Sequence, residues 1–417
     1  MSKIDELIKK LCPYGVEYKK LEDISTFERG KGFKKEDKGT GDSPIIFYGE
    51  LYTTYGNYID EIVSFVDEKK VANKIYANKE DIVLPISSTT AEAQIGKASV
   101  VRVDRAILGS DAIVIHNNIN SSYLMYYINS KIFEFYKMKC VSGTTIRHLA
   151  PKEMMQIKVA VPPLEVQCEI VHILDDFTLL SAELSAELKA RQKQYDFYKQ
   201  KVFDSIKTKK IKHITDIALV KARVGWQRLT KSEYLNSGNY YLITGTDFTT
   251  DGNINFESCV YVSKDRYEMD KNIQVHKDDI LITKDGTLGK VAILKEEPSK
   301  ETTLNSGVFR IKVLNDKEVY PKYLYHFFTS KYFKDFVESV KTGSTIPHLT
   351  QQGLVTLDIP IPSLEEQIKL SGLLDNFDIL TNDITEGLPA EIETRRKQYE
   401  YYRDKLLTFK ELKVNEG

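Results

Sequence analysis

Two short segments of the chain combine glycine, hydroxyl side chains and histidine in an order that suits phosphate binding. One reads Ser-Gly-Thr-Thr-Ile-Arg-His-Leu at 142–149, and the other reads Thr-Gly-Ser-Thr-Ile-Pro-His-Leu at 342–349. Backbone N–H and hydroxyl groups in such a loop can bind phosphate oxygens, with Arg and His nearby. The candidate contacts are Gly143, Thr144, Thr145, Arg147, His148, Gly343, Ser344, Thr345 and His348. A structural turn that closes a domain is an equally good interpretation of the same residues.

A second set of side chains has the chemistry needed to read the edges of bases. Reading a duplex requires hydrogen-bond donors and acceptors at base edges, together with cations at the phosphates. In the first half of the chain the candidates are Arg29, Lys31, Lys34, Lys35, Tyr52, Thr53, Tyr55, Asn57, Ser87, Ser88, Thr89 and Gln94. In the second half they are Arg223, Trp226, Thr249, Asn253, Lys284, Thr287, Lys290 and Asn305. Each one alone is more typical of a solvated loop, so the prediction concerns the groups.

Sequence patterns of catalysis and metal binding are missing from the chain. Cys12, Cys140, Cys168 and Cys259 are far apart, without a CxxC pair or a histidine at zinc-ligand spacing. There is no glycine-rich cofactor loop, no Asn-Pro-Pro-aromatic or Asp-Pro-Pro-aromatic tetrapeptide, and no convincing nuclease cluster of carboxylates with lysine. We therefore expect no catalytic residue, no cofactor and no metal in this chain.

The overall charge of the chain is balanced. Of 417 residues, 59 are Lys or Arg and 60 are Asp or Glu, so contacts with a polyanion must rest on local patches. The composition is 41% hydrophobic, which is enough for two or more packed domains. No apolar run approaches the length needed to span a bilayer. With its scattered cysteines, the chain is expected to be cytoplasmic, and neither secreted nor embedded in a membrane.

The chain contains an internal duplication. The glycine segment recurs 200 positions later, and the same offset carries Pro-Pro-Leu-Glu-Val-Gln at 162–167 onto Pro-Ser-Leu-Glu-Glu-Gln at 362–367. Residues 191–198 match 395–402 at an offset of 204, which adds one helical turn to the second copy. Repeat arrays need about three or more short units. Two large copies instead favour a pseudo-twofold molecule.

Each copy is predicted to contain a globular part followed by a long helix. Strands are expected at 81–86, 98–103 and 112–116, and at 279–283, 290–294 and 308–313. A helix at 122–138 or 321–340 precedes the glycine loop, and a last strand at 157–161 or 355–361 follows it. The predicted fold class is α+β, with two globular mixed α/β domains at 1–161 and 206–361 and two long antiparallel coiled-coil helices at 162–205 and 362–410.

The long helices have a clear start and an apolar seam. Pro163 suits the first turn of a helix and Glu165 favours its N-terminal dipole. Apolar residues then recur about every 3.5 positions, which predicts a coiled coil. A Gly-Leu-Pro sequence at 387–389 predicts a kink in the second helix.

A tandem Ser-Ala-Glu-Leu pair at 181–188 lies within the first long helix. Good helix formers alone would explain it. Alternatively it adjusts the length of a spacer, because four residues lengthen a helix by roughly 6 Å, about two base pairs of duplex.

The segments 195–201 and 399–405 are aromatic and basic in both copies. Their main expected role is to continue the helix seam. Because aromatic and Arg side chains also suit interface cores, Tyr195, Tyr198, Tyr399, Tyr402 and Arg403 are candidate contacts for a protein partner.

The two glycine loops, the two Pro-rich helix starts and the Arg-Arg-Lys-Gln-Tyr-Glu-Tyr-Tyr tail at 395–402 together resemble the specificity subunit of type I restriction-modification systems. The resemblance spans the whole chain. It implies that each globular domain is a target recognition domain for one half of a bipartite double-stranded DNA site. It further implies partnership with two methylation subunits and, in the full complex, two restriction subunits, with S-adenosylmethionine and ATP/Mg on those partners and no catalysis in this chain.

Two rival classes stay open on the residues alone. One is an enzyme that itself methylates or cuts DNA, which cofactor binding by the purified chain would support. The other is a protein-binding scaffold built on a coiled coil, which saturable binding to a split duplex site would remove.

Overall fold

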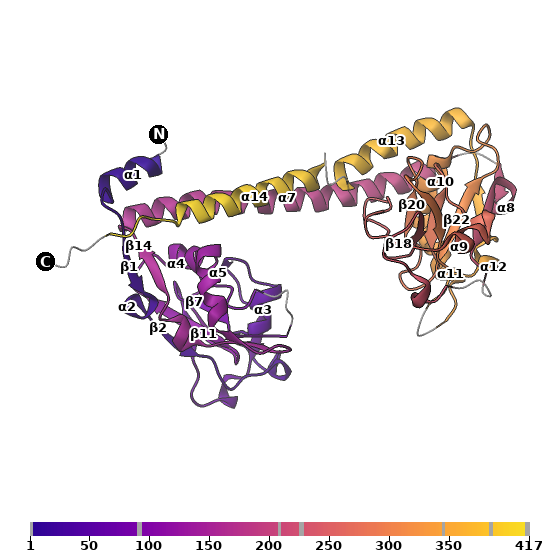
Figure 1. Cartoon of the computed structure of the whole chain (residues 1–417). Coiled ribbons are helices and arrows are strands. Elements are labelled where there is room, and N and C mark those ends of the chain that lie inside the picture. Colours follow the sequence, from indigo (N-terminus) through magenta and orange to yellow (C-terminus); the bar gives the residue numbers. More distant parts are fainter. Residues whose placement is uncertain are drawn as a thin grey trace. The chain divides into compact units, whose positions relative to one another are not determined.

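A computed structural model describes residues 3–89, 94–206, 210–224, 229–343, 347–382 and 387–412, without the side chains of 381 and 382. Its contacts divide the chain into two units. Unit 1 comprises Met1–Ala182 with Thr394–Gly417, and unit 2 comprises Glu183–Glu393. Each unit therefore holds one globular part and a share of the long helices (Figure 1).

The globular part of unit 1 is built on two main sheets. Among the described residues, one sheet has the strand order β2-β11-β7-β9-β4 and the other β5-β3-β10-β6. Smaller sheets pair β1 with β14 and place β13 between β12 and β8. The strands are β1 (Glu17–Lys20), β2 (Ser25–Arg29), β3 (Ser43–Ile46), β4 (Tyr58–Ile59), β5 (Ser64–Val66), β6 (Tyr76–Asn78), β7 (Ile82–Pro85), β8 (Ser87–Ser88), β9 (Ser99–Val101), β10 (Arg105–Leu108), β11 (Ala112–Asn117), β12 (Val141–Ser142), β13 (Arg147–Leu149) and β14 (Lys158–Val161).

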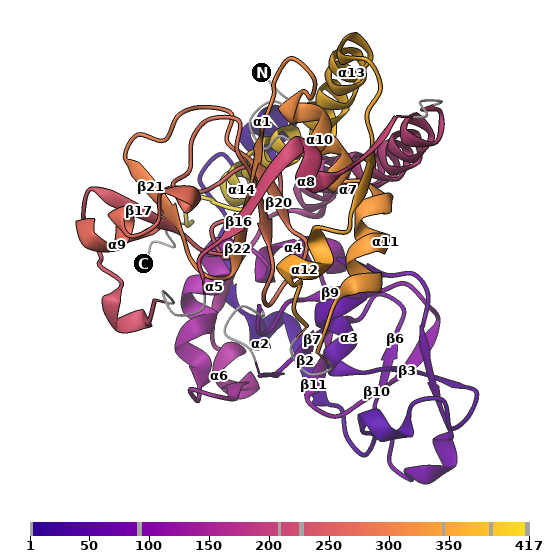
Figure 2. The same cartoon turned by 90° about the vertical axis from the view of Figure 1, so that its right-hand side faces the viewer.

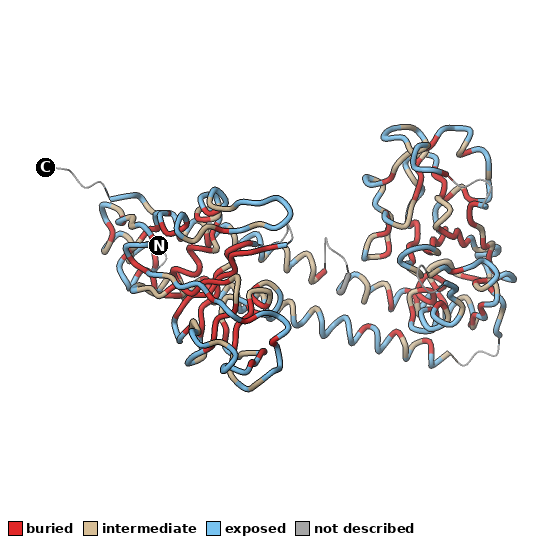
Figure 3. The backbone as a smooth tube through the Cα atoms, turned by 90° about the horizontal axis from the view of Figure 1, so that it is seen from below, coloured by how far each residue is buried: buried red, intermediate tan, exposed pale blue. Residues whose placement is uncertain are grey.

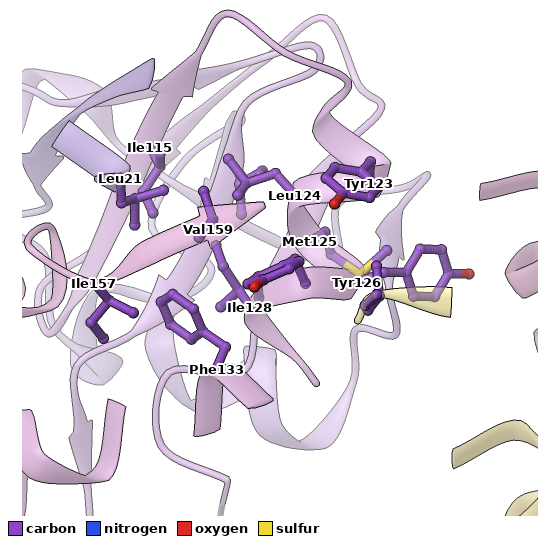
Figure 4. Close-up of a cluster of buried hydrophobic side chains, with 14 of the residues drawn as sticks. Leu21, Ile115, Tyr123, Leu124, Met125, Tyr126, Ile128, Phe133, Ile157 and Val159 are labelled. Carbon is purple, nitrogen blue, oxygen red and sulfur yellow. The ribbon is translucent and has the colours of Figure 1, made fainter. Parts of the chain in front are cut away.

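Strand β7 is buried on both faces, which explains its unbroken apolar sequence. Successive side chains of a strand point to opposite faces of the sheet. Ile82 and Leu84 accordingly join one core cluster, whereas Val83 joins another on the opposite face. The first cluster includes residues of helix α4 (Ser121–Ile128) and of strand β14 (Figure 4).

The remaining elements of unit 1 are short helices that cover these sheets. Asn120 caps the first helix after β11, and Ser130 caps the next, each accepting a backbone N–H with its side chain. The helices are α1 (Lys3–Leu11), α2 (Leu21–Ile24), α3 (Tyr48–Thr53), α4 (Ser121–Ile128), α5 (Lys131–Lys137) and α6 (Pro151–Met154), with 3₁₀ turns η1 (Lys35–Asp37), η2 (Glu68–Lys70) and η3 (Met138–Cys140).

Unit 2 repeats this plan in the residues described. One sheet has the order β16-β22-β19-β20, another β18-β17-β21, and β15 pairs with β23. Figure 2 shows β17, β21 and α9 as a group separate from β16, β22 and β20. The strands are β15 (Ile211–His213), β16 (Ala218–Ala222), β17 (Tyr240–Ile243), β18 (Val260–Tyr261), β19 (Ile280–Thr283), β20 (Val291–Ile293), β21 (Glu301–Leu304), β22 (Val308–Val313) and β23 (Asp358–Pro360). The helices are α8 (Ile214–Ile217), α9 (Lys264–Glu268), α10 (Pro321–Phe328), α11 (Lys331–Val340) and α12 (Gln351–Leu354), with 3₁₀ turns η5 (Lys231–Glu233) and η6 (Lys271–Ile273).

The long helices are α7 (Leu164–Asp204), α13 (Leu364–Asn382) and α14 (Leu388–Leu406). In unit 1 the end of α14 lies along the first part of α7, where Phe177 stacks on Tyr402 with ring centroids 5.6 Å apart. In unit 2 Phe377 of α13 stacks on Tyr198 of α7 at 6.1 Å. These are equivalent contacts of the two copies. Buried positions recur along the long helices and are dense in the globular parts (Figure 3).

A buried glutamine joins each globular part to the helix that follows it. Gln167 Nε2 donates to Pro162 O at 2.7 Å, and its Oε1 accepts the N–H of Asn120 at 3.0 Å. Gln367 makes the same bonds, to Pro362 O at 2.9 Å and from the N–H of Tyr320 at 2.9 Å. Because an unpaired buried backbone group is costly, this amide fixes the start of the helix in both units.

A carboxylate about two turns further along the helix makes a second junction contact, with different partners in the two units. Asp175 accepts hydrogen bonds at 2.6 Å from the hydroxyls of Tyr58 and Tyr126. Asp375 instead lies 2.8 Å from His326 Nε2 and 2.7 Å from Lys322 Nζ. Burial raises the pKa of Asp375, but its bonds with His326 and Lys322 outweigh that effect and lower the pKa to about 2.

The predicted fold class and duplication are confirmed, with two refinements of the elements. The single helix expected at 122–138 is two helices, α4 and α5, because the Asn129-Ser130 sequence ends one and caps the next. The helix expected at 321–340 is divided at the equivalent place into α10 and α11, although Ser330 makes no side-chain cap bond there. Along the second long helix the structure describes α13 as far as Asn382 and α14 from Leu388, and residues 383–386 between them lie outside the described residues, so the kink expected at 387–389 stays a prediction.

We predict that Asp375→Asn destabilises unit 2 at neutral pH by roughly 1–2 kcal/mol, after allowance for solvent screening. A carboxylate whose folded pKa is depressed stabilises the fold above its unfolded pKa and loses this effect as the pH falls through about 2. The deficit of the variant should therefore shrink below about pH 4. Urea unfolding, followed by fluorescence of the single tryptophan of the chain, measures it.

Asp358→Asn is the matched control, because Asp358 pairs with His213 at 2.6 Å while both side chains are more than half exposed. It should cost less than about 1 kcal/mol. Equal losses for the two variants at pH 7 would contradict the role of the Asp375 junction.

Candidate nucleic-acid interface

The recurring glycine loop is attached to the same place on the sheet in both units. In unit 1, β13 pairs with β12 and β8, so that His148 lies opposite Ser87, and Leu149 N donates to Ile86 O at 2.9 Å. In unit 2, His348 bridges to Thr342 and to Asp285, and Leu349 N donates to Lys284 O at 2.9 Å. The loop therefore extends from the end of the central strand, β7 or β19.

Glycine is required at the start of this loop. Gly143 has φ +92° and Gly343 has φ +87°, a region that L side chains rarely adopt. A Cβ on Gly143 would clash with the backbone oxygen of Ile146. Thr144 and Thr145 are exposed on the loop. Ser344 and Thr345 of the second loop lie outside the described residues.

In unit 1 a hydrogen-bonded cluster surrounds the loop histidine. Ser87 Oγ donates to Asp111 Oδ1 at 3.1 Å and lies 3.0 Å from His148 Nδ1. Arg29 reaches the same carboxylate at 3.5 Å. Tyr52 donates its hydroxyl to Ser87 O at 3.0 Å, and burial raises the pKa of Tyr52, so the phenol stays a donor at physiological pH.

In unit 2 the equivalent histidine contacts a carboxylate directly. His348 Nδ1 lies 2.6 Å from Asp285 Oδ1, and both side chains are almost half exposed. Thr287 and Lys290 are exposed on the turn that follows Asp285, and that turn is held by Thr283 Oγ1, which donates to Thr287 O and accepts from Lys290 N. The ammonium of Lys284 lies 5.3 Å from the centre of the Phe309 ring.

A basic segment adjoins the cluster of unit 1. Lys31, Lys34 and Lys35 are exposed. Lys34 and Lys35 line a cavity of about 590 Å³ whose wall also includes Thr53 and Asp111. Thr89 and Gln94 are exposed on the segments that flank residues 90–93, which lie outside the described residues. The structure thus brings a large share of the first-half candidates to one region.

The candidates of the second half are more dispersed. Thr249 and Asn253 bond to each other across a turn, through Asn253 N and Thr249 Oγ1 at 3.0 Å. Thr249 and Lys290 line a cavity of about 630 Å³ that also touches Lys199 of α7. Asn305 donates its side-chain amide to the hydroxyl of Tyr234. Trp226 lies outside the described residues.

Five candidates have structural roles in the positions where the structure places them. Tyr55 is 7% exposed and its hydroxyl accepts the N–H of Val63. Arg223 is 2% exposed and donates to Leu304 O at 2.9 Å. Ser87 and Ser88 are also buried, and the side chain of the half-buried Asn57 is hydrogen-bonded to Tyr399. Their side chains do not lie free at the surface, so we leave them out of the candidate DNA contacts.

The aromatic tails pack against neighbouring helices within their units. Tyr195 is buried and stacks on Phe377 at 5.9 Å, and Arg403 is buried beside Tyr399. Burial lowers the pKa of the neighbouring Lys199 to about 8, although Asp378 opposes this effect. Tyr198 and Tyr402 remain more than 40% exposed, so they alone of the five candidates present substantial surface to a partner.

Sequence reasoning missed Asp111 and Asp285. Neither has a distinctive neighbouring motif, and Asp111 has no acidic counterpart in the second copy, where Gly307 occupies its position. One sequence signal could have identified Asp285. When the sequences of β7 and β19 are aligned, Asp285 falls at the position of the candidate Ser87.

Metal sites and membrane spans are absent from the part of the chain that the structure describes. Its residues contain no group of three or more His, Cys, Asp or Glu side chains placed to hold a metal ion. None of the helices in this part of the chain is long and apolar enough to cross a membrane.

Comparison with known sequences gives a consistent family match. The sequence profile described as type I restriction modification DNA specificity domain matches residues 13–191 and again 206–394. A putative type I restriction enzyme specificity subunit from Haemophilus influenzae is 33% identical over 304 residues, covering 70% of this chain and 73% of that protein. The EcoR124I/EcoR124II specificity subunit of Escherichia coli is 27% identical over 444 residues, covering 98% of each.

Solved structures share the fold at low sequence identity. A crystal structure of a type I restriction-modification S subunit from M. genitalium aligns with a TM-score of 0.51 at 14% identity, covering 94% of this chain and 96% of that one. A chain from a structural study of type I R-M complex assembly and conformational transition aligns at 0.65 and 13% identity, covering 94% and 97%. These likenesses establish the fold only.

We predict that Gly143→Ala distorts the loop of unit 1 and costs about 1–3 kcal/mol, because Ala is strained at this φ and its Cβ meets Ile146 O. Hydrogen exchange of residues 141–149 should accelerate. Gly49→Ala is the control, since nothing lies within 4 Å of the position that its Cβ would take and its φ is ordinary. Unchanged exchange in Gly143→Ala would show that the loop conformation does not depend on this glycine.

Proposed function

The chain belongs to the family of type I restriction-modification DNA specificity proteins, and on that basis we propose that its two units read the two halves of one bipartite duplex site. Membership makes the chain the DNA-recognition component of a restriction-modification complex. The chemistry of such a complex belongs to other subunits, and this chain is not itself an enzyme.

One observation carries the proposal for two half-sites. The same glycine loop is attached by the same backbone bonds to the end of the same strand in both units. Around it, the exposed side chains differ, with Arg29 and Asp111 in unit 1 and Asp285 in unit 2. A constant loop suits phosphate, which is common to all sequences, whereas variable neighbours suit base edges.

The proposed contacts of unit 1 are the candidates that are exposed, together with the partly exposed Arg147 of the loop. They are Arg29, Lys31, Lys34, Lys35, Thr53, Thr89, Gln94, Gly143, Thr144, Thr145, Arg147 and His148. In unit 2 the proposed contacts are Lys284, Thr287, Lys290, Asn305, Gly343 and His348, with Thr249 and Asn253 further along the surface. The lysines are proposed to neutralise phosphates rather than to read bases.

The proposed partners follow from the family. DNA and the other subunits of a restriction-modification complex are its expected ligands. We propose two methylation subunits per chain, one for each copy of the duplication, and two restriction subunits in the full complex. S-adenosylmethionine and ATP with Mg²⁺ would then bind to those subunits, and the cytoplasm, where the DNA is, is the proposed location.

The helices supply the proposed docking surface for the methylation subunits. Tyr198 and Tyr402 occupy equivalent positions of the duplication and remain partly exposed. The Ser-Ala-Glu-Leu pair at 181–188 lies within α7. The number of residues in this part of the helix is proposed to set the gap between the half-sites.

The rival function, a protein-binding scaffold without DNA recognition, makes an opposite prediction about binding. The chain purified with its methylation subunit should bind a genomic duplex that contains its split site and discriminate against a scrambled duplex. Fluorescence anisotropy measures this difference. Identical affinity for the two duplexes would favour the scaffold.

We predict that Lys34→Ala and Lys35→Ala each weaken binding to specific and scrambled duplexes by a similar factor. Each variant should also reduce the slope of log affinity against log salt by about 1, because each lysine neutralises one phosphate. Lys264→Ala is the control, since Lys264 is an exposed lysine on α9, paired with Glu268, and outside the proposed contacts. An unchanged salt slope in Lys34→Ala and Lys35→Ala would exclude those phosphate contacts.

A further inference from the structure

A carboxylate lies beside the glycine loop in both units, although it comes from different strands. The backbone establishes which positions correspond. Ile86 N donates to Asp111 O at 2.9 Å in unit 1, and Lys284 N donates to Gly307 O at 2.9 Å in unit 2. Asp111 and Gly307 therefore occupy equivalent positions at the start of β11 and β22, as Ser87 and Asp285 do after β7 and β19.

The carboxylate follows or precedes a different strand in each unit, but it lies at an equivalent place beside the loop. In unit 1 it is Asp111, whose Oδ1 accepts from Ser87 Oγ at 3.1 Å. In unit 2 position 307 is glycine, and a Cβ at that position would lie 3.6 Å from Asp285 Oδ2. The carboxylate of Asp285 thus reaches the space where a side chain at 307 would begin.

Both carboxylates are linked to the loop histidine and both remain open to solvent. Asp285 contacts His348 at 2.6 Å, while Asp111 reaches His148 through Ser87. The side chain of Asp111 is 40% exposed and that of Asp285 is 42% exposed. Each carboxylate therefore has oxygen surface left for a further donor.

An exposed carboxylate is unfavourable on a surface that faces phosphates, unless a donor meets it. The bases offer two suitable donors in the major groove, the N6 amino group of adenine and the N4 amino group of cytosine. Guanine and thymine present acceptors at the corresponding major-groove positions, which would repel a carboxylate. The position of the two carboxylates beside the proposed phosphate loop therefore selects for an amino-bearing base.

We propose that Asp111 and Asp285 are specificity-determining residues, each accepting a hydrogen bond from the exocyclic amino group of an adenine or cytosine in its own half-site. This inference rests on the proposed function and deepens it. The two units differ in the cation beside the carboxylate. In unit 1, Arg29 lies opposite Ile113 in the sheet. At the equivalent position of unit 2, opposite Phe309, the residue is Ala222. Arg29 adds a guanidinium beside Asp111 that can donate to a guanine, whereas in the described residues the ion pair of Asp285 is with His348.

The test combines protein variants with bases that lack one amino group. The chain with its methylation subunit is bound to a duplex carrying its mapped site, in which single adenines are replaced by purine and single cytosines by 2-pyrimidinone. The wild type should lose about tenfold or more in affinity at one position in each half-site. Asp285→Ala should abolish the loss in one half, and Asp111→Ala should abolish it in the other.

A matched control separates base reading from simple support of the loop. Asp358→Ala removes a carboxylate that also lies 2.6 Å from a histidine in unit 2, but that belongs to β23, the strand paired with β15. It should leave unchanged the loss of affinity that each base analogue causes. If Asp285 only anchors His348, Asp285→Ala will weaken all duplexes equally and keep every penalty, which overturns the proposal.

The outcomes also distinguish this inference from the proposed function. A complex that selects its site but shows no coupling between either aspartate and any amino group retains the function and refutes the inference. Coupling of both aspartates to the same half-site also refutes it. A wild-type complex that does not discriminate between duplexes refutes both.

Discussion

The arrangement of each unit depends on a buried amide that ties the globular part to its helix. Gln167 and Gln367 each satisfy a carbonyl before the helix and an N–H at the start of α4 or α10. Without the amide these backbone groups would lose this hydrogen bond at a partly buried junction, which is costly. The helix that follows therefore has a fixed origin relative to the sheet of its own unit. The stacked pairs Phe177–Tyr402 and Phe377–Tyr198 then pack a second helix against it.

The two units keep the supports of the loop and vary what surrounds it. The positive φ of Gly143 and Gly343 and the bond from Leu149 or Leu349 to the central strand are common to both. Both units have a carboxylate beside the loop, but it comes from non-equivalent sequence positions. It is Asp111 in unit 1 and Asp285 in unit 2. Such a division suits a protein that must bind any DNA backbone and yet read two different sequences. The helix junctions have diverged as well, since Asp175 meets tyrosine hydroxyls while Asp375 meets His326 and Lys322.

The sequence alone predicted the fold class, the duplication and the principal strands, because apolar runs, glycines and the repeated helix starts are local signals. It did not divide the helix at 122–138, since the cap at Ser130 competes with an otherwise continuous apolar pattern. The buried positions of Tyr55 and Arg223 could not be predicted, because polar side chains in a loop sequence look alike until tertiary contacts such as Val63 to Tyr55 form. Asp111 and Asp285 could not be predicted for the same reason, because the residues that they contact are far away in sequence.

The most direct test of the account is methylation mapping of genomic DNA from cells that express the methylation subunit with or without this chain. The account predicts adenine marks in a two-part motif with a fixed gap, present only when the chain is expressed. Marks that are identical with and without the chain would contradict its role in recognising DNA.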